Sequence, residues 1–429
     1  MGMSLHTGDS AARRSSPIGK QVHIGLDYGT FSTKVIVRSR GEPKGKVLLL
    51  DEKPTEGYPS FATPSAVRVR QDRIYFGGRA VSEQGGTFIK SLKVQLLPYD
   101  SALGQKLLAL PPGTDPEFLI ACYLGWALGE IKQRIGDRTK ENVSLNIAAP
   151  MSHIVEPSLK ERYLRIVQAA WESVFGQEPF NVTQGCELKT LSEYFAMWLE
   201  RDPPDLSQRR YEVLPETIAP FISLCKNPKT EPGMYLIVDM GAGTTEFSVI
   251  QVTDANPDKQ QNLNCYFDLS IRIGGDDFQI VEGQTRVEHF RNLVLERFGG
   301  SFGETWKKAS DKDDVRAARS KWRKLRVLLT GGGAKHPLID DLILKRRPAS
   351  CFGVAEEAYT RSWHHPTSLD SSSLSAVITE SDLPLLSVAH GLSFERQLWQ
   401  VYFVPDEIGS VHPIIEGDES PAVHMHLEK

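Results

Sequence analysis

A β-hairpin pattern that occurs twice constrains the fold of this chain more than any other feature. The first copy is VHIGLDYGTFSTKVIVR at residues 22–38, and the second is MYLIVDMGAGTTEFSVIQV at residues 234–252. In each copy a β-rich run ends near an aspartate, a short turn with glycine and threonine follows, and a second β-rich run begins. Asp239 takes the place of Asp27 after an interval of 212 residues. A repeat of this length predicts two duplicated α/β lobes, each opening with a glycine-containing hairpin.

Composition supports a two-lobed globular chain and removes several classes of function. The 429 residues are 40% hydrophobic and 24% charged, and the net charge of −4 gives no positive field for nucleic acid or anionic membrane. No run approaches the roughly 18 consecutive apolar residues of a transmembrane helix. The five cysteines are scattered and form no CxxC pair, which favours a reducing compartment. We therefore expect a soluble, cytoplasmic protein without a nucleic-acid or membrane partner.

The chain divides into segments of different character. Residues 1–21 are polar and lack the apolar run of a signal peptide. Residues 201–232 contain six prolines and mixed charge, which indicates a linker or insertion between lobes. Residues 364–382 are serine-rich and predict a surface loop. The predicted organisation is a disordered tail over 1–21, lobe I over 22–200, a linker or insertion over 201–232, lobe II over 233–386, a helix packing back on the cleft over 387–404, and a flexible tail over 405–429.

The two hairpin turns have the composition of a phosphate site. Glycine-rich turns let backbone N–H groups approach a polyanion, and Thr30, Thr244 and Thr245 add hydroxyl donors. An aspartate beside a phosphate requires a cation, and Mg²⁺ held through its waters by Asp27 and Asp239 meets that need. One such turn alone is usually an ordinary hairpin. Two related copies favour phosphate binding.

A third glycine-rich segment follows a later predicted strand. LLTGGGAKHPLIDDLI at residues 328–343 places Gly331, Gly332 and Gly333 between a strand and a helix. The backbone of such a loop can pack against a flat ring or a phosphate, and the helix N-terminus favours anions. A plain strand-to-helix turn is the alternative interpretation.

Taken together, these motifs resemble the actin, sugar-kinase and 70-kDa heat-shock ATPase superfamily, and most of all its heat-shock chaperone branch. GLDYGTFSTKV resembles the first phosphate loop, VDMGAGTTEFSV the second, IRIGGDDF the turn after it, and LLTGGGAKHPLID the adenosine loop. The resemblance extends over residues 22–404. It implies two duplicated actin-like (ribonuclease-H-like) lobes with a nucleotide cleft between them, and ATP with Mg²⁺ as the ligands.

The resemblance also implies which residues contact the nucleotide. Asp27 and Asp239 would hold Mg²⁺ through water. The positions carried over for cofactor binding are Asp27, Gly29, Thr30, Phe31, Lys34, Gly241, Ala242, Gly243, Thr244, Thr245, Gly274, Gly275, Gly331, Gly332 and Gly333.

Four residues are expected to catalyse hydrolysis on the same basis. FIKSL resembles the segment that holds the chaperones' catalytic lysine, which makes Lys90 the candidate for contacting the γ-phosphate and the attacking water. Glu187 resembles the glutamate that helps to order Mg²⁺ and water. Asp239 and Thr244 complete the set. The plain alternatives are a surface lysine for Lys90 and an exposed helix acid for Glu187.

The sequence departs from the chaperone pattern in several places. Phe31 stands where chaperones carry a small hydroxyl residue, and Lys34 resembles the phosphate-contacting lysine of actins. Glu246 ends a GAGTTE run that is similar to the second loop of exopolyphosphatases. Gly331 follows Gly275 by only 56 positions, so the upper part of lobe II is expected to be short.

The function that these observations favour is a slow, heat-shock-chaperone-like ATPase. It would act as a nucleotide-dependent conformational switch without its own substrate-binding domain, and a protein partner or client would read its ATP or ADP state. The alternatives are an actin-like filament protomer, or an exopolyphosphatase or sugar-kinase type of phosphotransfer enzyme.

Overall fold

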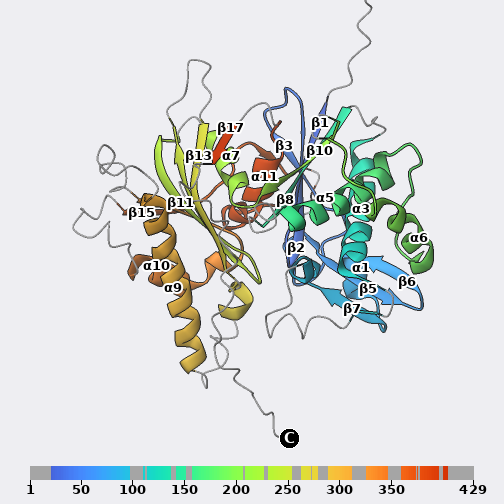
Figure 1. Cartoon of the computed structure of the whole chain (residues 1–429), viewed down its shortest axis with the longest axis horizontal. Coiled ribbons are helices and arrows are strands. Elements are labelled where there is room, and N and C mark those ends of the chain that lie inside the picture. Colours follow the sequence, from blue (N-terminus) through green and yellow to red (C-terminus); the bar gives the residue numbers. More distant parts are fainter. Residues whose placement is uncertain are drawn as a thin grey trace, which may run out of the picture.

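The computed structural model describes residues 21–96, 110–111, 114–136, 142–150, 157–205, 208–226, 230–253, 262–271, 273–278, 288–311, 325–345, 359–372, 374, 377–395 and 400–403. Helices and sheets are mixed throughout this part of the chain, so the predicted α/β class is confirmed (Figure 1). No described helix is both long enough and apolar enough to span a bilayer. The predicted tails at the two ends lie outside the described residues, except for Gln21.

The first main sheet is built around the first hairpin. Three antiparallel strands follow one another, and two further strands run parallel to the first of them, on its other side. Short strands extend it at the far edge. Its strands are β1 (Val22–Tyr28), β2 (Ser32–Ser39), β3 (Gly45–Leu48), β8 (Val143–Ala149) and β10 (Tyr211–Pro215), with β4 (Thr63–Pro64) paired to β2 and β16 (Leu369–Asp370) paired to β3.

The second main sheet is built around the second hairpin and has the same order of strand directions. Its first three strands are antiparallel, and two later strands lie parallel on the other side of the first. A last strand pairs with the third. The strands are β11 (Gly233–Met240), β12 (Thr245–Val252), β13 (Asn262–Ile271), β14 (Leu325–Thr330), β15 (Tyr359–Trp363) and β17 (Gln400–Phe403).

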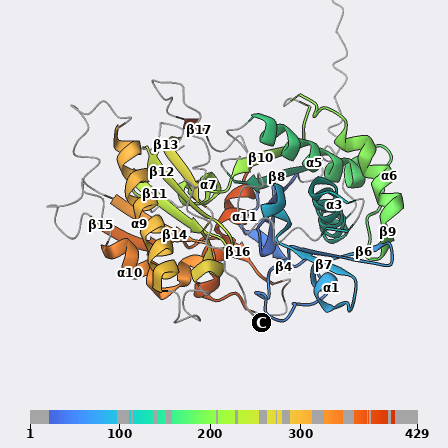
Figure 2. The same ribbon diagram turned by 60° about the horizontal axis from the view of Figure 1, so that its bottom comes forward.

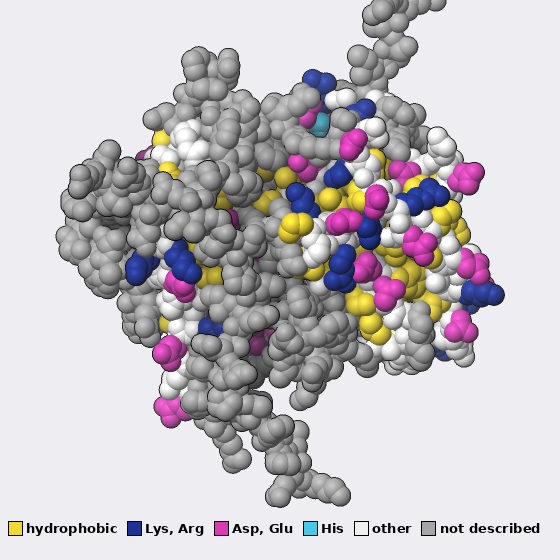
Figure 3. Space-filling view, in the orientation of Figure 1, with side chains coloured by type: hydrophobic (Ala, Val, Ile, Leu, Met, Phe, Trp, Pro, Cys, Tyr) yellow, Lys and Arg dark blue, Asp and Glu magenta, His cyan; other side chains and the backbone are white. Residues whose placement is uncertain are grey.

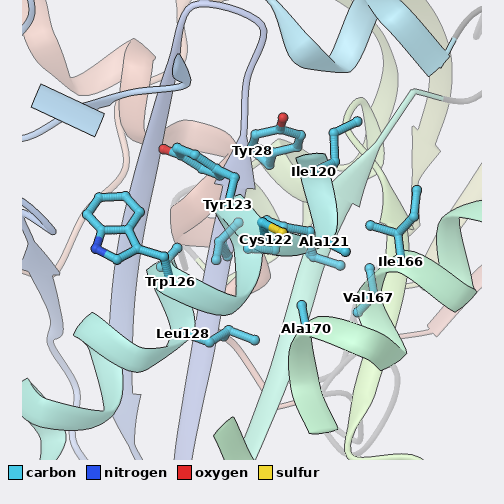
Figure 4. Packing of buried hydrophobic residues seen from close by; sticks show 14 of the residues in the cluster. Tyr28, Ile120, Ala121, Cys122, Tyr123, Trp126, Leu128, Ile166, Val167 and Ala170 are labelled. Atoms are coloured by element: carbon cyan, nitrogen blue, oxygen red, sulfur yellow. The ribbon is translucent and has the colours of Figure 1, made fainter. Parts of the chain in front are cut away.

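Long helices cover the main sheets. α3 (Pro116–Ile135) and α5 (Pro157–Phe175) pack on the first, and α3 begins where Asp115 Oδ1 accepts a hydrogen bond from Phe118 N at 2.8 Å. Figure 4 shows this core, where Tyr123 of α3 lies between Tyr28 of β1 and Trp126 of the same helix. Further helices include α6 (Leu188–Leu199) beside α3 and α5, α9 (Glu288–Asp311) and α10 (Pro337–Lys345) on the second main sheet, and the short α1 (Gly77–Ser82), η1 (Leu92–Leu96) and η4 (Gly333–Lys335).

A small third sheet lies beside the first main sheet (Figure 2). It consists of β5 (Ala66–Arg70), β6 (Arg73–Phe76), β7 (Thr87–Lys90) and β9 (Cys186–Glu187). Across the described surface of this half of the molecule, basic and acidic side chains alternate (Figure 3), as in the ion pair of 2.7 Å between Arg162 and Glu117.

The prediction that residues 201–232 form a linker or insertion is wrong. This segment contains β10, which completes the first main sheet, and α7 (Ile218–Cys225). The prolines that suggested a break are compatible with both elements. Pro215 ends an edge strand and Pro220 lies in the first turn of a helix, two places where proline costs no needed hydrogen bond.

Helices α7 and α11 (Ser387–Leu392) are exchanged between the two halves of the chain. α7 follows the first main sheet, but Phe221 and Ile222 pack with Tyr235 and other residues of the second. α11 follows the second main sheet but packs on the first, where Asn146 Nδ2 donates to the carbonyl of Leu392 at 2.7 Å. Each main sheet is therefore held by a helix from the other half. The predicted segment 387–404 contains this helix, and its end forms β17.

A buried hydrogen-bond network joins the exchanged helices to β2. Arg38 Nη2 lies 3.1 Å from His390 Nε2, and His390 Nδ1 lies 2.7 Å from Ser223 Oγ on α7. Because a guanidinium can only donate, the neutral imidazole accepts at Nε2 and donates from Nδ1 to Ser223. Burial lowers the pKa of His390 well below its usual value, and the nearby Arg38 charge lowers it further. The network therefore requires a neutral histidine.

Acid is expected to weaken the fold through these histidines. Burial lowers the pKa of His364 from 6.5 to about 3. The folded state thus binds fewer protons than the unfolded state between these values, and stability is lost as the pH falls below 6.5. For His364 alone, the free energy of unfolding at pH 5 is expected to fall by about 2 kcal/mol. Urea unfolding at pH 7.5 and pH 5 measures it.

The neighbouring histidine supplies the control. His365 is exposed and only adds to the effect of burial on the pKa of His364, so His365→Asn should make the pH dependence slightly less steep and His364→Asn much less steep. Equal slopes for His364→Asn and the unsubstituted chain would contradict the burial argument.

Candidate functional site

A cavity of about 660 Å³ lies where the two hairpin turns meet. Its walls come from both main sheets and from the glycine turns. The lining residues are Asp27, Gly29, Thr30, Phe31, Ser32, Lys34, Gly57, Pro59, Lys93, Glu216, Asp239, Gly241, Ala242, Thr244, Gly275, Asp276, Thr330, Gly331, Gly332, Gly333, Lys335, His336, Pro384, Leu385 and Val388.

The first hairpin places a carboxylate and an ammonium group side by side. Asp27 near the end of β1 is the register partner of Lys34 on β2, and Lys34 Nζ lies 3.1 Å from Asp27 Oδ2. The turn between them is tight. A Cβ at Gly29 would lie 2.7 Å from the carbonyl oxygen of Ser32, so glycine is needed for this path. The result is a buried carboxylate at the cavity with one cation already beside it.

The second hairpin brings a second, half-buried carboxylate to the same cavity. Asp239 lies near the end of β11, and Gly241 N closes the turn by donating to the carbonyl of Thr244 at 2.9 Å. Burial raises the pKa of Asp239 from 3.8 to about 7, and the negative charge of Asp27 raises it further, while Lys34 and Lys93 act in the opposite direction. Two carboxylates that repel each other in one cavity fit a divalent cation, which would relieve the repulsion.

Three glycine turns pack against one another on the side of the second sheet. Gly275 N donates to the carbonyl of Gly241 at 2.8 Å, and a Cβ at Gly275 would lie 2.8 Å from Gly333 Cα. Gly331 has a φ of +79°, and a Cβ there would lie 2.6 Å from Asp239 Oδ1. The backbone thus forms this wall of the cavity without side chains, as the approach of a polyanion requires.

Lys90 lies outside the cavity lining, and Lys93 takes the place expected for it. Lys90 is exposed on β7, whereas Lys93 is buried and forms an ion pair with Glu216. Burial lowers the pKa of Lys93 to about 8, although the charges of Asp27, Glu246 and Asp239 act to raise it. The two lysines stand three residues apart, and the residue types alone do not say which of them faces the cavity.

The backbone explains which lysine turns inward. Ser91 has a φ of +58°, and this left-handed residue ends β7 before η1 begins at Leu92. Lys93 therefore lies on a helical turn that faces the cavity, and not on the strand. A pattern of residue types does not reveal such a change of direction.

Glu187 also lies outside the cavity lining. It is exposed on β9 of the third sheet, 3.9 Å from Arg73 on β6. Glu216, which comes directly after β10, is the glutamate that reaches the cavity. The sequence prediction missed it because residues 201–232 were interpreted as a linker.

Most of the predicted cofactor positions line the cavity, and three do not. The three are Gly243, Gly274 and Thr245. Thr245 is buried and donates to the carbonyl of Ile273 at 2.6 Å, and Gly274 N donates to Asp277 Oδ2 at 2.8 Å, so both hold the turns in shape. Of the four predicted catalytic residues, Asp239 and Thr244 lie at the cavity.

Phe31 forms an aromatic part of the wall. Its ring stacks on Tyr58 with centroids 4.4 Å apart and still leaves 45% of Phe31 exposed. The departure from a small hydroxyl residue thus adds a flat apolar surface beside the first turn.

The predicted short upper part of lobe II is only partly described. α9 lies in the interval between Gly275 and Gly331, and residues 279–287 and 312–324 are outside the described part of the chain.

The carboxylates at the cavity suit a cation that is also bound by the oxygen atoms of a ligand. Within the described ranges, no three histidine, cysteine, aspartate or glutamate side chains are grouped to bind a metal by themselves. Mg²⁺ is commonly held by one or two carboxylates together with water and phosphate oxygens, and Asp27 and Asp239 supply two.

Neither the models of known protein families nor the curated proteins include a match to this chain.

Proposed function

We propose that the chain binds ATP with Mg²⁺ in this cavity and hydrolyses it slowly, as a nucleotide-dependent switch of the heat-shock chaperone type. One observation carries the proposal: Asp27 and Asp239, from the two copies of one hairpin pattern, line one cavity together with Lys93 and Glu216. The shared strand order of the two main sheets supports two duplicated actin-like lobes with the nucleotide between them.

Each residue has a role that follows from its charge and position. Asp27 and Asp239 would hold Mg²⁺ through water, and the glycine turns would present backbone N–H groups to the phosphates. Lys93 would stabilise negative charge on the terminal phosphate as its bond breaks. Glu216 holds Lys93 in place through their ion pair. Mg²⁺, when bound, neutralises phosphate charge and orients the phosphate chain.

A switch follows from the position of the cavity between two sheets. A triphosphate that contacts both hairpin turns would bind more tightly when the two main sheets are close together, and so would favour that closed arrangement. Loss of the terminal phosphate would remove some of these contacts and weaken the preference for the closed arrangement. A protein partner or client would respond to the change.

Binding of ATP to the wild-type chain with and without Mg²⁺ tests the proposal. Asp239→Asn is expected to weaken binding of the Mg²⁺ complex by about 100-fold, because a negative charge in the cavity that attracts the cation is lost. Glu187→Gln is the matched control, since this carboxylate lies outside the cavity, and it should bind as the wild type does. Calorimetry measures both affinities. A folded wild-type chain with no Mg²⁺-dependent affinity for ATP would refute the proposal.

One observation favours a second candidate, hydrolysis of inorganic polyphosphate. Glu246 is buried beside the hairpin turn, and its charge acts on Lys93. Glu246 does not line the cavity, so its charge would act on a phosphate chain through Lys93. Phosphate release from polyphosphate, measured beside release from ATP, distinguishes the two substrates.

A further inference from the structure

A second cavity, of about 290 Å³, lies at the end of the first main sheet where β1 begins (Figure 1). Its wall includes the chain that follows α11. This helix packs directly on β1, since a Cβ at Gly25 would lie 2.3 Å from the carbonyl oxygen of Ala389. After the helix, Asn146 Nδ2 on β8 donates to the carbonyl of Phe394 at 3.1 Å. The next residue, Glu395, then forms part of the cavity wall.

A buried histidine of β1 also lines this cavity. His23 is 8% exposed, and its Nδ1 lies 2.6 Å from the hydroxyl of Ser144, its register partner on β8. Among the described residues, Nε2 of His23 has no hydrogen-bond partner. Burial lowers the pKa of His23 from 6.5, although the charge of Glu395 acts to raise it, so the ring is neutral at pH 7. A neutral ring with its proton on Nδ1, facing Ser144, offers a lone pair at Nε2.

The wall holds two hydrogen-bond acceptors that are separated by the width of one shared donor. Glu395 Oε2 lies 3.9 Å from His23 Nε2 and 3.8 Å from Arg40 Nε, and both distances exceed that of a hydrogen bond. A nitrogen atom between Nε2 and Oε2 can lie about 2.9 Å from each of them. Because one acceptor is a carboxylate and the other a neutral imidazole, a protonated amine suits this place better than a hydroxyl group does.

Arginines supply positive charge to the same cavity. Arg40, Arg209 and Arg210 all line it, and guanidinium groups bind carboxylates through paired hydrogen bonds. Glu212 lines it as well, so the described wall carries three guanidinium groups and, with Glu395, two carboxylates. Such a mixed wall complements a ligand with charges of both signs better than it complements a multiply charged anion.

We propose that this cavity binds a small zwitterion of the α-amino acid class, with its ammonium group between His23 Nε2 and Glu395 Oε2 and its carboxylate against the arginines. The volume is near the lower end of the range for small-molecule sites, roughly 300–1,000 Å³, which suits a ligand of this size. His23 and Asp27 are four residues apart on β1, which is about 13 Å along a strand. The site is therefore separate from the cavity at the hairpin turns, and the proposal does not depend on ATP binding.

Calorimetry with each of the common α-amino acids in turn, in the absence of nucleotide, tests the proposal. We expect at least one of them to bind with a dissociation constant of about 1 mM or lower. The α-hydroxy acid with the same side chain should bind about tenfold more weakly, because its hydroxyl group carries no charge to pair with Glu395. The absence of any such amino acid would overturn the proposal, and so would a hydroxy acid that binds equally well.

Two variants connect the affinity to this cavity. Glu395→Gln should remove most of the discrimination between the amino acid and its hydroxy acid, because the charge that selects the ammonium group is lost. Arg40→Gln should weaken binding of both ligands by a similar factor, since both carry the carboxylate. Arg70→Gln and Glu83→Gln are the matched controls. Arg70 Nη1 lies 3.4 Å from Glu83 Oε2, and neither residue lines the cavity, so both controls should bind as the wild type does. Unchanged discrimination in a folded Glu395→Gln variant would overturn the proposal.

Discussion

Lys93→Met is expected to lower the rate of Mg²⁺-dependent ATP hydrolysis by about 100-fold or more, and Lys90→Met to leave it within about twofold. Removing one positioned hydrogen-bond donor that faces the negative charge developing in the transition state typically lowers the rate by about this factor. Lys93 is buried at the cavity next to Glu216, whereas Lys90 is exposed on β7. Single-turnover phosphate release at saturating ATP measures the chemical step.

A second variant separates catalysis from stability. Lys93→Met leaves Glu216, whose side chain is 14% exposed, without its partner, which destabilises the fold by itself. Lys93→Met combined with Glu216→Gln removes the unpaired charge, so it should recover stability in urea but not hydrolysis. If Lys90→Met abolishes hydrolysis and Lys93→Met does not, the assignment based on resemblance is correct and the geometric one is wrong.

The local patterns in the sequence predicted the parts of the site that depend on neighbouring residues. A strand, an aspartate and a glycine turn are consecutive in the chain, so Asp27 and Asp239 could be found from their surroundings, and both line the cavity. The glycines of the third loop followed from the same reasoning. Such patterns fix how a turn is built, because the backbone demands of a tight turn are local.

Lys93 and Glu216 could not be assigned in this way. Which of two nearby lysines faces inward depends on the left-handed φ of Ser91, a residue type with no special preference for it. Glu216 depends on a strand pairing between β10 and β8, which are far apart in the chain. Two other features depend on contacts between distant parts of the chain: the exchange of α7 and α11, and the pairing of β16 with β3. The pattern of apolar residues along the chain does not predict such contacts.

Gly391→Ala is expected to destabilise the fold by more than about 4 kcal/mol, the range reserved for severe defects. A Cβ at Gly391 would lie 1.7 Å from the carbonyl oxygen of Ala219, so α11 and α7 could not keep their close contact. The clash is with backbone, and no change of side-chain rotamer relieves it. Because each of these helices holds the main sheet of the other half, the loss spreads to both.

Gly300→Ala is the matched control, since this glycine lies in helix α9 with open space around its Cβ position, and it should raise stability by about 0.5–1 kcal/mol. Urea unfolding followed by circular dichroism measures both variants. Wild-type stability in Gly391→Ala would mean that the two helices do not cross at this contact, and the exchange of helices between the halves would lose its main support.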